Sequence, residues 1–193
     1  MAKVDFMSVL HKSTKRDYLA RANDPEYPKA KAAELAKQFD YDYWDGDRRI
    51  CYGGYRYLKG RWEKVARAIA SHYPLPKKPK ILDIGCGKGF LLYDFIKVIP
   101  DAEVNGIDIS KYAIDNSKKE IRDRLTIGSA CNLPWRDNYF DLVISINTLH
   151  CLHANELHRA LTEMERVGGK YKYVCVESWR NQIEKANLLY WQV

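Results

Sequence analysis

The sequence lacks any apolar run that approaches the roughly 18 residues of a membrane-spanning helix. Its N-terminus also lacks the apolar core of a signal peptide. The 5 cysteines are scattered and contain no C-x-x-C pair, which argues against a disulfide framework and against a structural zinc site. We therefore expect a cytoplasmic protein with reduced thiols and no membrane partner.

Strong compositional bias is missing too, and no internal repeat or low-complexity tract is present. With 193 residues, 46% of them hydrophobic, the chain is long enough for one domain with a sizeable core. The net charge of +7 fits nucleic acid or an acidic small substrate, but lysines on helix faces usually only solvate the surface. Charge alone therefore does not identify a partner.

The most informative stretch is Lys80 to Phe90, which reads KILDIGCGKGF. Ile81, Leu82 and Ile84 form a short apolar run that predicts a buried parallel strand, and helical spacing begins after Gly89. A strand, a glycine-rich turn and a helix in this order can bind nucleotide-like ligands. Glycines allow the backbone to approach the ligand, and the helix N-terminus offers unpaired N–H groups. The alternative is a turn that only connects strand to helix.

An acidic residue at the end of the second predicted strand favours the ligand-binding interpretation. Asp108 lies 19 residues after Gly89, where a carboxylate can accept both hydroxyls of a ribose. This spacing indicates an adenosine-type ligand, either NAD or S-adenosylmethionine. Phe90 occupies the position of the third glycine of the dinucleotide fingerprint, and Asp83 suits a positive amino group better than a pyrophosphate. Both residues favour S-adenosylmethionine.

The order of the predicted elements indicates an α/β fold, a doubly wound Rossmann-like parallel sheet. Strands are predicted at 80–84, 103–107, 125–128, 141–146 and 172–176. Helices are predicted at 13–22, 29–39, 62–72, 89–98, 113–121, 155–167 and from 181 onward. We expect residues 1–61 to form an N-terminal cap or lid segment and residues 62–193 to form the cofactor-binding domain.

Three segments resemble the class I S-adenosylmethionine-dependent methyltransferases: Leu82 to Gly89, Gly106 to Ser110, and Gly128 to His150. The resemblance covers the chain from about Trp62 onward. It implies a transferase with S-adenosylmethionine as cofactor and S-adenosylhomocysteine as product. The cofactor-binding residues that it implies come from the glycine turn and the strand ends: Asp83, Gly85, Cys86, Gly87, Asp108, Ile109, Ser129, Ala130, Cys131 and Asn147.

The resemblance also implies a role for several of these residues. Gly85 and Gly87 would pass beneath the methionine and ribose portions, with Asp83 near the amino group. Asp108 would hold the ribose hydroxyls, and Ile109 would lie against the adenine. Ser129 stands where the family commonly has an acidic residue, and Asn147 would face the methionine end and the transferring methyl group.

A further departure from the family concerns the end of the sheet. The family usually adds a C-terminal β-hairpin after the helix that begins near Asn181, whereas this sequence stops at Val193. We therefore expect the hairpin to be missing and the fifth strand to have an exposed edge. The N-terminal segment or a second subunit in a homodimer could cover that edge, or the chain could be truncated.

Candidate catalytic residues follow the predicted fourth and fifth strands: Asn147, His150 and Glu177. His150 is the preferred general base because the usual pKa of histidine lies near neutrality. The alternative is a histidine packed at the start of a helix. His150 and His153 lie three residues apart, but without a nearby carboxylate they make a poor metal site, so we predict no metal.

The segment from Tyr41 to Trp62 is dense in tyrosine, glycine and arginine. Aromatic rings on a glycine-jointed loop can stack on a flat ligand, and arginine can bind a carboxylate. We expect Tyr52, Tyr55 and Tyr57 to form a lid or acceptor pocket and Arg61 to bind the cofactor carboxylate. The alternative is an aromatic loop packed on the domain surface.

Four functions remain open from the sequence. The preferred one is a methyltransferase for a small-molecule acceptor. An RNA or protein methyltransferase is favoured only by the basic charge, and the end of the fourth strand lacks the Asn-Pro-Pro-Tyr type of sequence. The others are a non-catalytic, methyltransferase-like cofactor-binding protein and an NAD-dependent oxidoreductase.

Overall fold

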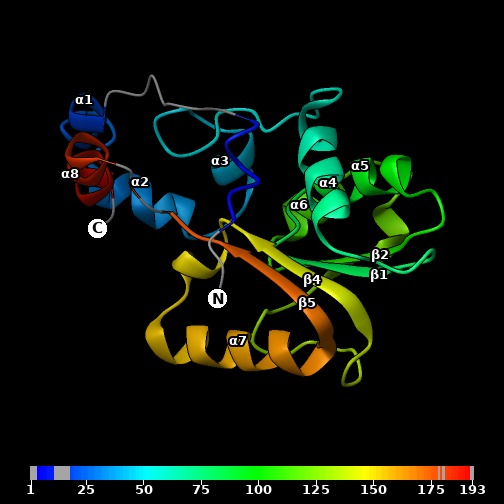
Figure 1. Ribbon diagram of the computed structural model, residues 1–193. Helices are drawn as coiled ribbons and strands as arrows, with labels where there is room; N and C mark the ends of the chain where they lie inside the picture. The colour runs from blue at the N-terminus through cyan, green and yellow to red at the C-terminus, as the bar shows by residue number, and fades with distance from the viewer. Residues whose placement is uncertain (1–3, 11–17, 178, 180, 192–193) are drawn as a thin grey trace. The chain divides into compact units, whose positions relative to one another are not determined.

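The computed structural model describes residues 4–10, 18–177, 179 and 181–191 (Figure 1). Contacts divide the chain into two compact units. The first comprises Met1–Lys12 and Tyr57–Val176, and the second comprises Ser13–Arg56 and Glu177–Val193. The predicted division at residues 61 and 62 lies close to the boundary at Tyr57. The C-terminal helix, however, belongs with the N-terminal segment.

A parallel sheet of five strands forms the centre of the first unit, in the order β3-β2-β1-β4-β5. The sheet and its flanking helices confirm the predicted α/β class. The strands are β1 (Lys80–Ile84), β2 (Glu103–Asp108), β3 (Leu125–Ile127), β4 (Phe140–Ile146) and β5 (Gly168–Cys175). The helices are α4 (Arg61–His72), α5 (Phe90–Val98), α6 (Lys111–Asp115) and α7 (Ala154–Val167), with 3₁₀ turns η1 (Arg122–Arg124) and η2 (Leu149–Cys151).

Both faces of the sheet are buried, as in other doubly wound folds. Alternate residues of a strand point to opposite faces. Ile81 accordingly joins a core cluster with residues of α4 and α5, and Leu82 joins a second cluster with Met164 of α7. Figure 1 shows α7 on the opposite side of the sheet from α4 and α5. This burial explains why β1 reads as a nearly continuous apolar run.

The largest errors in the predicted boundaries of the first unit concern one helix and one strand. The helix predicted at 113–121 is α6, which ends at Asp115, because the side-chain amide of Asn116 donates to the Tyr112 carbonyl oxygen (2.9 Å). The Arg122 guanidinium then holds the Ser117 carbonyl (2.8 Å), so local side-chain bonds replace another helical turn. The strand predicted at 172–176 begins at Gly168, directly after α7.

The N-terminal residues 4–10 belong to the first unit and pack on its core. Phe6 is buried, and its ring centroid lies 4.8 Å from that of Tyr173 in β5 and 5.3 Å from that of His72. In the described part of the chain, β5 pairs with β4 and with no other strand. The N-terminal segment thus packs beside a residue of β5 without extending the sheet.

The second unit contains α1 (Tyr18–Ala22), α2 (Lys29–Ala36), α3 (Tyr41–Trp44) and α8 (Gln182–Trp191). Residues 13–17 of the helix predicted at 13–22 lie outside the described residues. The helix predicted at 29–39 ends at Ala36, and α3 forms within a segment for which no helix was expected. Helix α8 contacts α1, and the Lys29 ammonium donates to the Tyr190 carbonyl.

Aromatic rings form a small core in this unit. Trp44 is buried and stacks on Tyr52, with centroids 5.4 Å apart and planes 5° from parallel. The Tyr55 ring lies 4.7 Å from Tyr52 and 5.3 Å from Trp44. The Tyr55 N–H also donates to the Trp44 carbonyl oxygen (2.9 Å). The loop therefore makes its aromatic and backbone contacts within its own unit.

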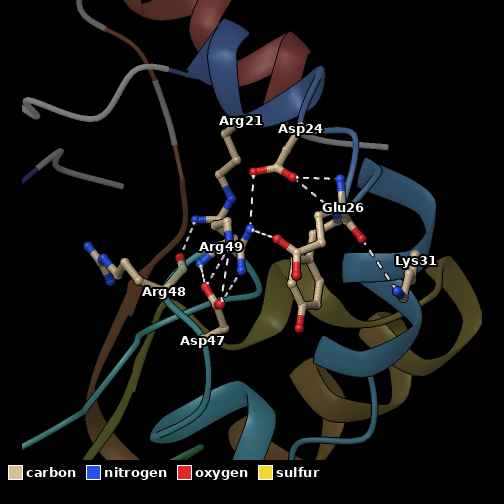
Figure 2. Close-up of polar contacts among 8 residues, drawn as sticks. Arg21, Asp24, Glu26, Lys31, Asp47, Arg48 and Arg49 are labelled. Carbon is tan, nitrogen blue, oxygen red and sulfur yellow. Dashed lines mark hydrogen bonds and ion pairs between the residues drawn. The ribbon is translucent and has the colours of Figure 1, made fainter.

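Arginines hold the same loop to the turn between α1 and α2 (Figure 2). The Arg49 guanidinium pairs with Asp47 (2.7 Å) and Glu26 (2.5 Å) and lies 4.4 Å from the Tyr27 ring centroid. The hydrogen bond from Arg49 is the largest cause that lowers the pKa of Asp47 to about 2. Arg21 donates to the Arg48 carbonyl (3.0 Å). Arg49 and Arg21 thus contact groups of their own unit.

Candidate functional site

The turn after β1 has a conformation and a packing that require glycine. Gly85, Gly87 and Gly89 all have positive φ, at 77°, 55° and 70°. The Gly85 N–H donates to the Ile107 carbonyl oxygen (2.8 Å), which joins the turn to β2. A Cβ atom at Gly85 would lie 2.0 Å from Thr148 Oγ1. Glycine at these positions therefore lets the backbone turn from β1 into the N-terminus of α5.

Asp108, the last residue of β2, is bound to the glycine turn. Its Oδ2 accepts from the Gly87 N–H (2.7 Å), and its Oδ1 accepts from the Ser110 N–H (2.8 Å). Burial raises the pKa of Asp108 above its usual value, and these two hydrogen bonds offset only part of the rise. A carboxylate has about four acceptor positions, so two further donors such as ribose hydroxyls can still bind.

Asp83 is a buried carboxyl group in β1, only 4% exposed. Among the described residues, no hydrogen bond reaches its carboxylate. Burial, with a smaller contribution from the charge of Asp108, raises the pKa of Asp83 to about 7. The ionised group would therefore be stabilised by a cation brought into the site. The Cys86 thiol is also buried, and burial raises its pKa well above the usual value, so it stays protonated.

The ends of β2 and β3 present apolar surface beside Asp108. Ile109 is 62% exposed and Ile127 is 49% exposed, and Ile127 pairs in register with Asp108. The exposed Ile109 fits its predicted place against an adenine ring. The sequence analysis did not predict Ile127 as part of this surface, although an apolar residue at the end of a strand can indicate one.

The loop after β3 is held by its own side chains. Ser129 Oγ accepts from the Cys131 N–H (3.1 Å), and the Cys131 thiol donates to the Glu156 carbonyl oxygen (3.3 Å). Ala130 lies between them. Ser129 is exposed, and its oxygen can accept a further hydrogen bond, for example from an amino group of a ligand.

After β4 the chain turns sharply at Asn147, whose φ is 53°. The Asn147 N–H donates to the Cys175 carbonyl oxygen (2.8 Å), so the turn is held by β5. His150 lies three residues later in η2 and is exposed. Within the described ranges, no group of three or more His, Cys, Asp and Glu side chains is placed to hold a metal ion.

The remaining predicted site residues are divided between the two units. Glu177, Tyr52 and Tyr55 lie in the second unit. Tyr57 and Arg61 lie in the first unit. The Tyr57 hydroxyl donates to Asp94 Oδ1 (2.6 Å), whereas Arg61 is exposed at the start of α4. The first unit thus brings together Asp83, Gly85, Cys86, Gly87 and Asp108.

Comparison with known proteins identifies this arrangement. A family model described as a methyltransferase domain matches residues 82–176, which contain the glycine turn, Asp108 and Asn147. This part of the chain belongs to the methyltransferase domain family. The sheet order and the glycine turn place it among the class I, S-adenosylmethionine-dependent members.

Curated relatives agree with the assignment of this methyltransferase domain. A demethylmenaquinone methyltransferase from Symbiobacterium thermophilum is 32% identical over 130 residues, which cover 62% of this chain and 50% of the relative. A tRNA (carboxymethyluridine(34)-5-O)-methyltransferase from Arabidopsis thaliana is 33% identical over 130 residues, covering 67% of this chain and 30% of the relative. The chain thus spans half or less of the length of these relatives.

A solved structure shows the same fold over most of the chain. It is a candidate S-adenosylmethionine-dependent methyltransferase from Methanococcus maripaludis, with a TM-score of 0.53 and 19% identity. The match covers 93% of this chain and 73% of that one. No helix in the described part of this chain is long and apolar enough to cross a membrane.

The residues of the methyltransferase domain fit S-adenosylmethionine. The buried Asp83 carboxyl has no protein partner among the described residues, and Asp108 keeps free acceptor positions toward a ribose. Exposed apolar surface at Ile109 lies one residue beyond Asp108. The NAD-dependent alternative is disfavoured by the family assignment and by Asp83, because a pyrophosphate would add negative charge near a carboxyl group.

Proposed function

We propose that the protein transfers a methyl group from S-adenosylmethionine to a small-molecule acceptor. The observation that carries the proposal is the pair of buried carboxyl groups, Asp83 and Asp108, on adjacent strands at the glycine turn. They provide negative charge and acceptor positions for a ligand with a cationic amino end and a ribose. The demethylmenaquinone methyltransferase relative supports a small acceptor, and the tRNA methyltransferase relative keeps RNA as the second candidate.

Each side chain has a role in binding or positioning. Asp83 would pair with the amino group, Asp108 would accept from the ribose hydroxyls, and Ile109 would cover the adenine. Asn147 would orient the methionine end, and Arg61 would bind the carboxylate. When bound, the cofactor supplies a methyl group on a good leaving group, so positioning and exclusion of water contribute much of the acceleration.

A general base is needed only if the acceptor keeps its proton at neutral pH. His150 is the first choice, because it is exposed in η2 and follows Asn147 by three residues. An imidazole there could take a proton from a hydroxyl or an amine. Glu177 remains the second choice, at the start of the second unit's C-terminal segment.

Calorimetric titration with S-adenosylmethionine, S-adenosylhomocysteine and NAD tests the cofactor assignment. We expect micromolar binding of the first two, no binding of NAD, and loss of binding in Asp108→Ala. Asp115→Ala is the matched control, because Asp115 is an exposed carboxylate that pairs with Lys111 on α6. Equal effects of both substitutions, or preferential binding of NAD, would contradict the proposal.

Formation of S-adenosylhomocysteine from pooled acceptors tests the reaction. Turnover with a small-molecule extract but not with RNA would support the preferred acceptor class. Turnover with RNA, together with steeply salt-dependent RNA binding, would favour the second candidate, because phosphate contacts release counterions. Cofactor binding without turnover on any pool would indicate a non-catalytic, cofactor-binding protein.

Three further parts of the proposal concern the surroundings of the site. Tyr52, Tyr55 and Tyr57 are proposed as lid or pocket residues, although their rings also pack within their own units.

A homodimer that covers the edge of β5 would appear as twice the monomer mass in light scattering. Reduced thiols in a cytoplasmic setting agree with the 5 cysteines, all of which are free in the structure.

A further inference from the structure

The end of β4 is joined to the glycine turn by side chains that have no part in the roles proposed above. The Ser145 hydroxyl donates to the Ile84 carbonyl oxygen (3.0 Å), and both residues are almost completely buried. The next residue but two, Thr148, lies against Gly85. Side chains at the end of β4 therefore hold two successive residues, Ile84 of β1 and Gly85 of the glycine turn.

Thr148 fills the space that the missing side chain of Gly85 leaves. A Cβ atom built on Gly85 would lie 2.0 Å, 2.3 Å and 2.6 Å from Thr148 Oγ1, Cγ2 and Cβ. Contacts this short do not occur for real Cβ atoms, so the Thr148 side chain packs directly on the Gly85 backbone. The Thr148 hydroxyl also lies 3.2 Å from the Ile146 carbonyl oxygen and 3.5 Å from that of Gly85.

The backbone at Asn147 brings Thr148 into this position. Left-handed backbone is costly for residues other than glycine, though least so for asparagine and aspartate. Here the conformation is held on one side by the bond from the Asn147 N–H to Cys175 and on the other by the packing of Thr148 on Gly85. A left-handed residue held by its surroundings is typical of functional turns.

We propose that Thr148 is a positioning residue for cofactor binding, which fixes the glycine turn by packing on Gly85 and connects it to Asn147 and His150. The inference rests on the proposed function, since the turn must bind S-adenosylmethionine for its position to matter. The turn and the end of β4 then move together. Cofactor binding should therefore also order the residues on the acceptor side, from Asn147 to Cys151.

Hydrogen exchange in the ligand-free protein tests the packing without any cofactor. In Thr148→Ala, we expect amides of Gly85 to Gly89 to exchange several-fold faster than in the unmodified chain. Thr148→Ser keeps the hydroxyl, so its exchange rates should fall between those of Thr148→Ala and those of the unmodified chain. Thr162→Ala is the control, because Thr162 is exposed on α7 and its hydroxyl also donates to a carbonyl, that of His158 (2.9 Å). Equal exchange in Thr148→Ala and Thr162→Ala would overturn the inference.

Titration with S-adenosylhomocysteine tests the consequence for binding. Losing a packed methyl and hydroxyl in Thr148→Ala should weaken binding about tenfold, with rescue to within about threefold in Thr148→Ser. Protection of Asn147 to Cys151 on ligand addition should also decrease in Thr148→Ala. Faster exchange with unchanged affinity would refute the positioning role and leave the proposed function intact. Absence of binding by the unmodified chain would refute the proposed function, and the positioning role with it.

Discussion

At the scale of single residues, the environment of Asp83 in β1 determines how the site should respond to pH. A carboxyl group that is 4% exposed, with no hydrogen bond to it among the described residues, gains little from being ionised. Its neighbours with ionisable groups are Asp108 on β2 and the Cys86 thiol in the turn. A cationic ligand would remove this penalty.

This environment predicts that cofactor affinity depends on pH. Because the pKa of Asp83 is raised to about 7 in the free protein, a cation that binds beside it must displace a proton below that pH. Affinity for S-adenosylmethionine should therefore rise with pH up to about 7 and then level off. Titrations between pH 5.5 and 8.5, in buffers of different ionisation enthalpy, would measure the released proton. A flat profile in the unmodified chain would contradict the prediction.

Asp83→Asn should stabilise the ligand-free protein at high pH while weakening cofactor binding. A carboxyl whose pKa is raised in the folded state costs stability once the pH exceeds its unfolded value, and the cost is complete above about pH 7. Three pKa units correspond to roughly 4 kcal/mol, which is an upper limit here. Thermal unfolding at pH 8 should give a higher Tm for Asp83→Asn, with little difference near pH 4. A lower Tm at pH 8 would contradict the argument.

At the scale of elements, Tyr57 begins the segment Tyr57–Val176 of the first unit and holds the start of that segment to α5. Its hydroxyl donates to Oδ1 of Asp94 (2.6 Å), and the Lys97 ammonium donates to both Tyr57 (2.6 Å) and Asp94 (3.0 Å). The Asp94 side chain is completely buried, and its Oδ2 has no hydrogen-bond partner among the residues that the structure describes. The Tyr57 ring also contacts Phe90, the first residue of α5.

Tyr57→Phe should destabilise the protein by about 1–3 kcal/mol, because it removes a donor from a buried carboxylate that already lacks one. Urea unfolding would measure the change. Tyr171→Phe is the matched control, since no hydrogen bond of its hydroxyl is found among the described residues. A loss in Tyr57→Phe no larger than in the control would show that Lys97 alone stabilises Asp94.

In the second unit, the Arg49 side chain connects two turns. Arg49→Ala should loosen residues 45–52 because it removes the ion pairs with Asp47 and Glu26 together. Faster limited proteolysis within this loop is the expected result. Arg67→Ala is the control, since Arg67 pairs with Glu63 one turn away on α4 and such exposed pairs contribute little. Equal cleavage in both variants would contradict the prediction.

At the scale of the whole molecule, both ends of the chain contribute to units whose other residues are distant in sequence. Residues 4–10 pack with β5, and α8 joins α1 and α2. The methyltransferase domain and the second unit therefore have separate cores, one built on a parallel sheet and one on aromatic stacking. A change that loosens one core should therefore leave the other core intact.

A chain that ends at Val176 tests this separation. Loss of α8 should accelerate hydrogen exchange in α1 and α2, because α8 contacts α1 and Lys29 binds the Tyr190 carbonyl. Amides of β1, β2 and β4 should keep their protection, since the sheet has its own buried core. Equal acceleration in the sheet would show that the two units fold as one.

The sequence by itself determined β1, the glycine turn, α4 and α7, as well as the place of Asp108 at the end of β2. These features depend on local apolar periodicity and on glycine conformation, both of which are written in neighbouring residues. The resemblance added the cofactor, and the family match confirmed the family.

Only the tertiary structure decided the contacts between distant segments. Thr148 packs on Gly85, Phe6 enters the core beside Tyr173, and the rings of Trp44, Tyr52 and Tyr55 stack together. Each of these depends on which side chains meet after folding, and no periodicity along the chain records that.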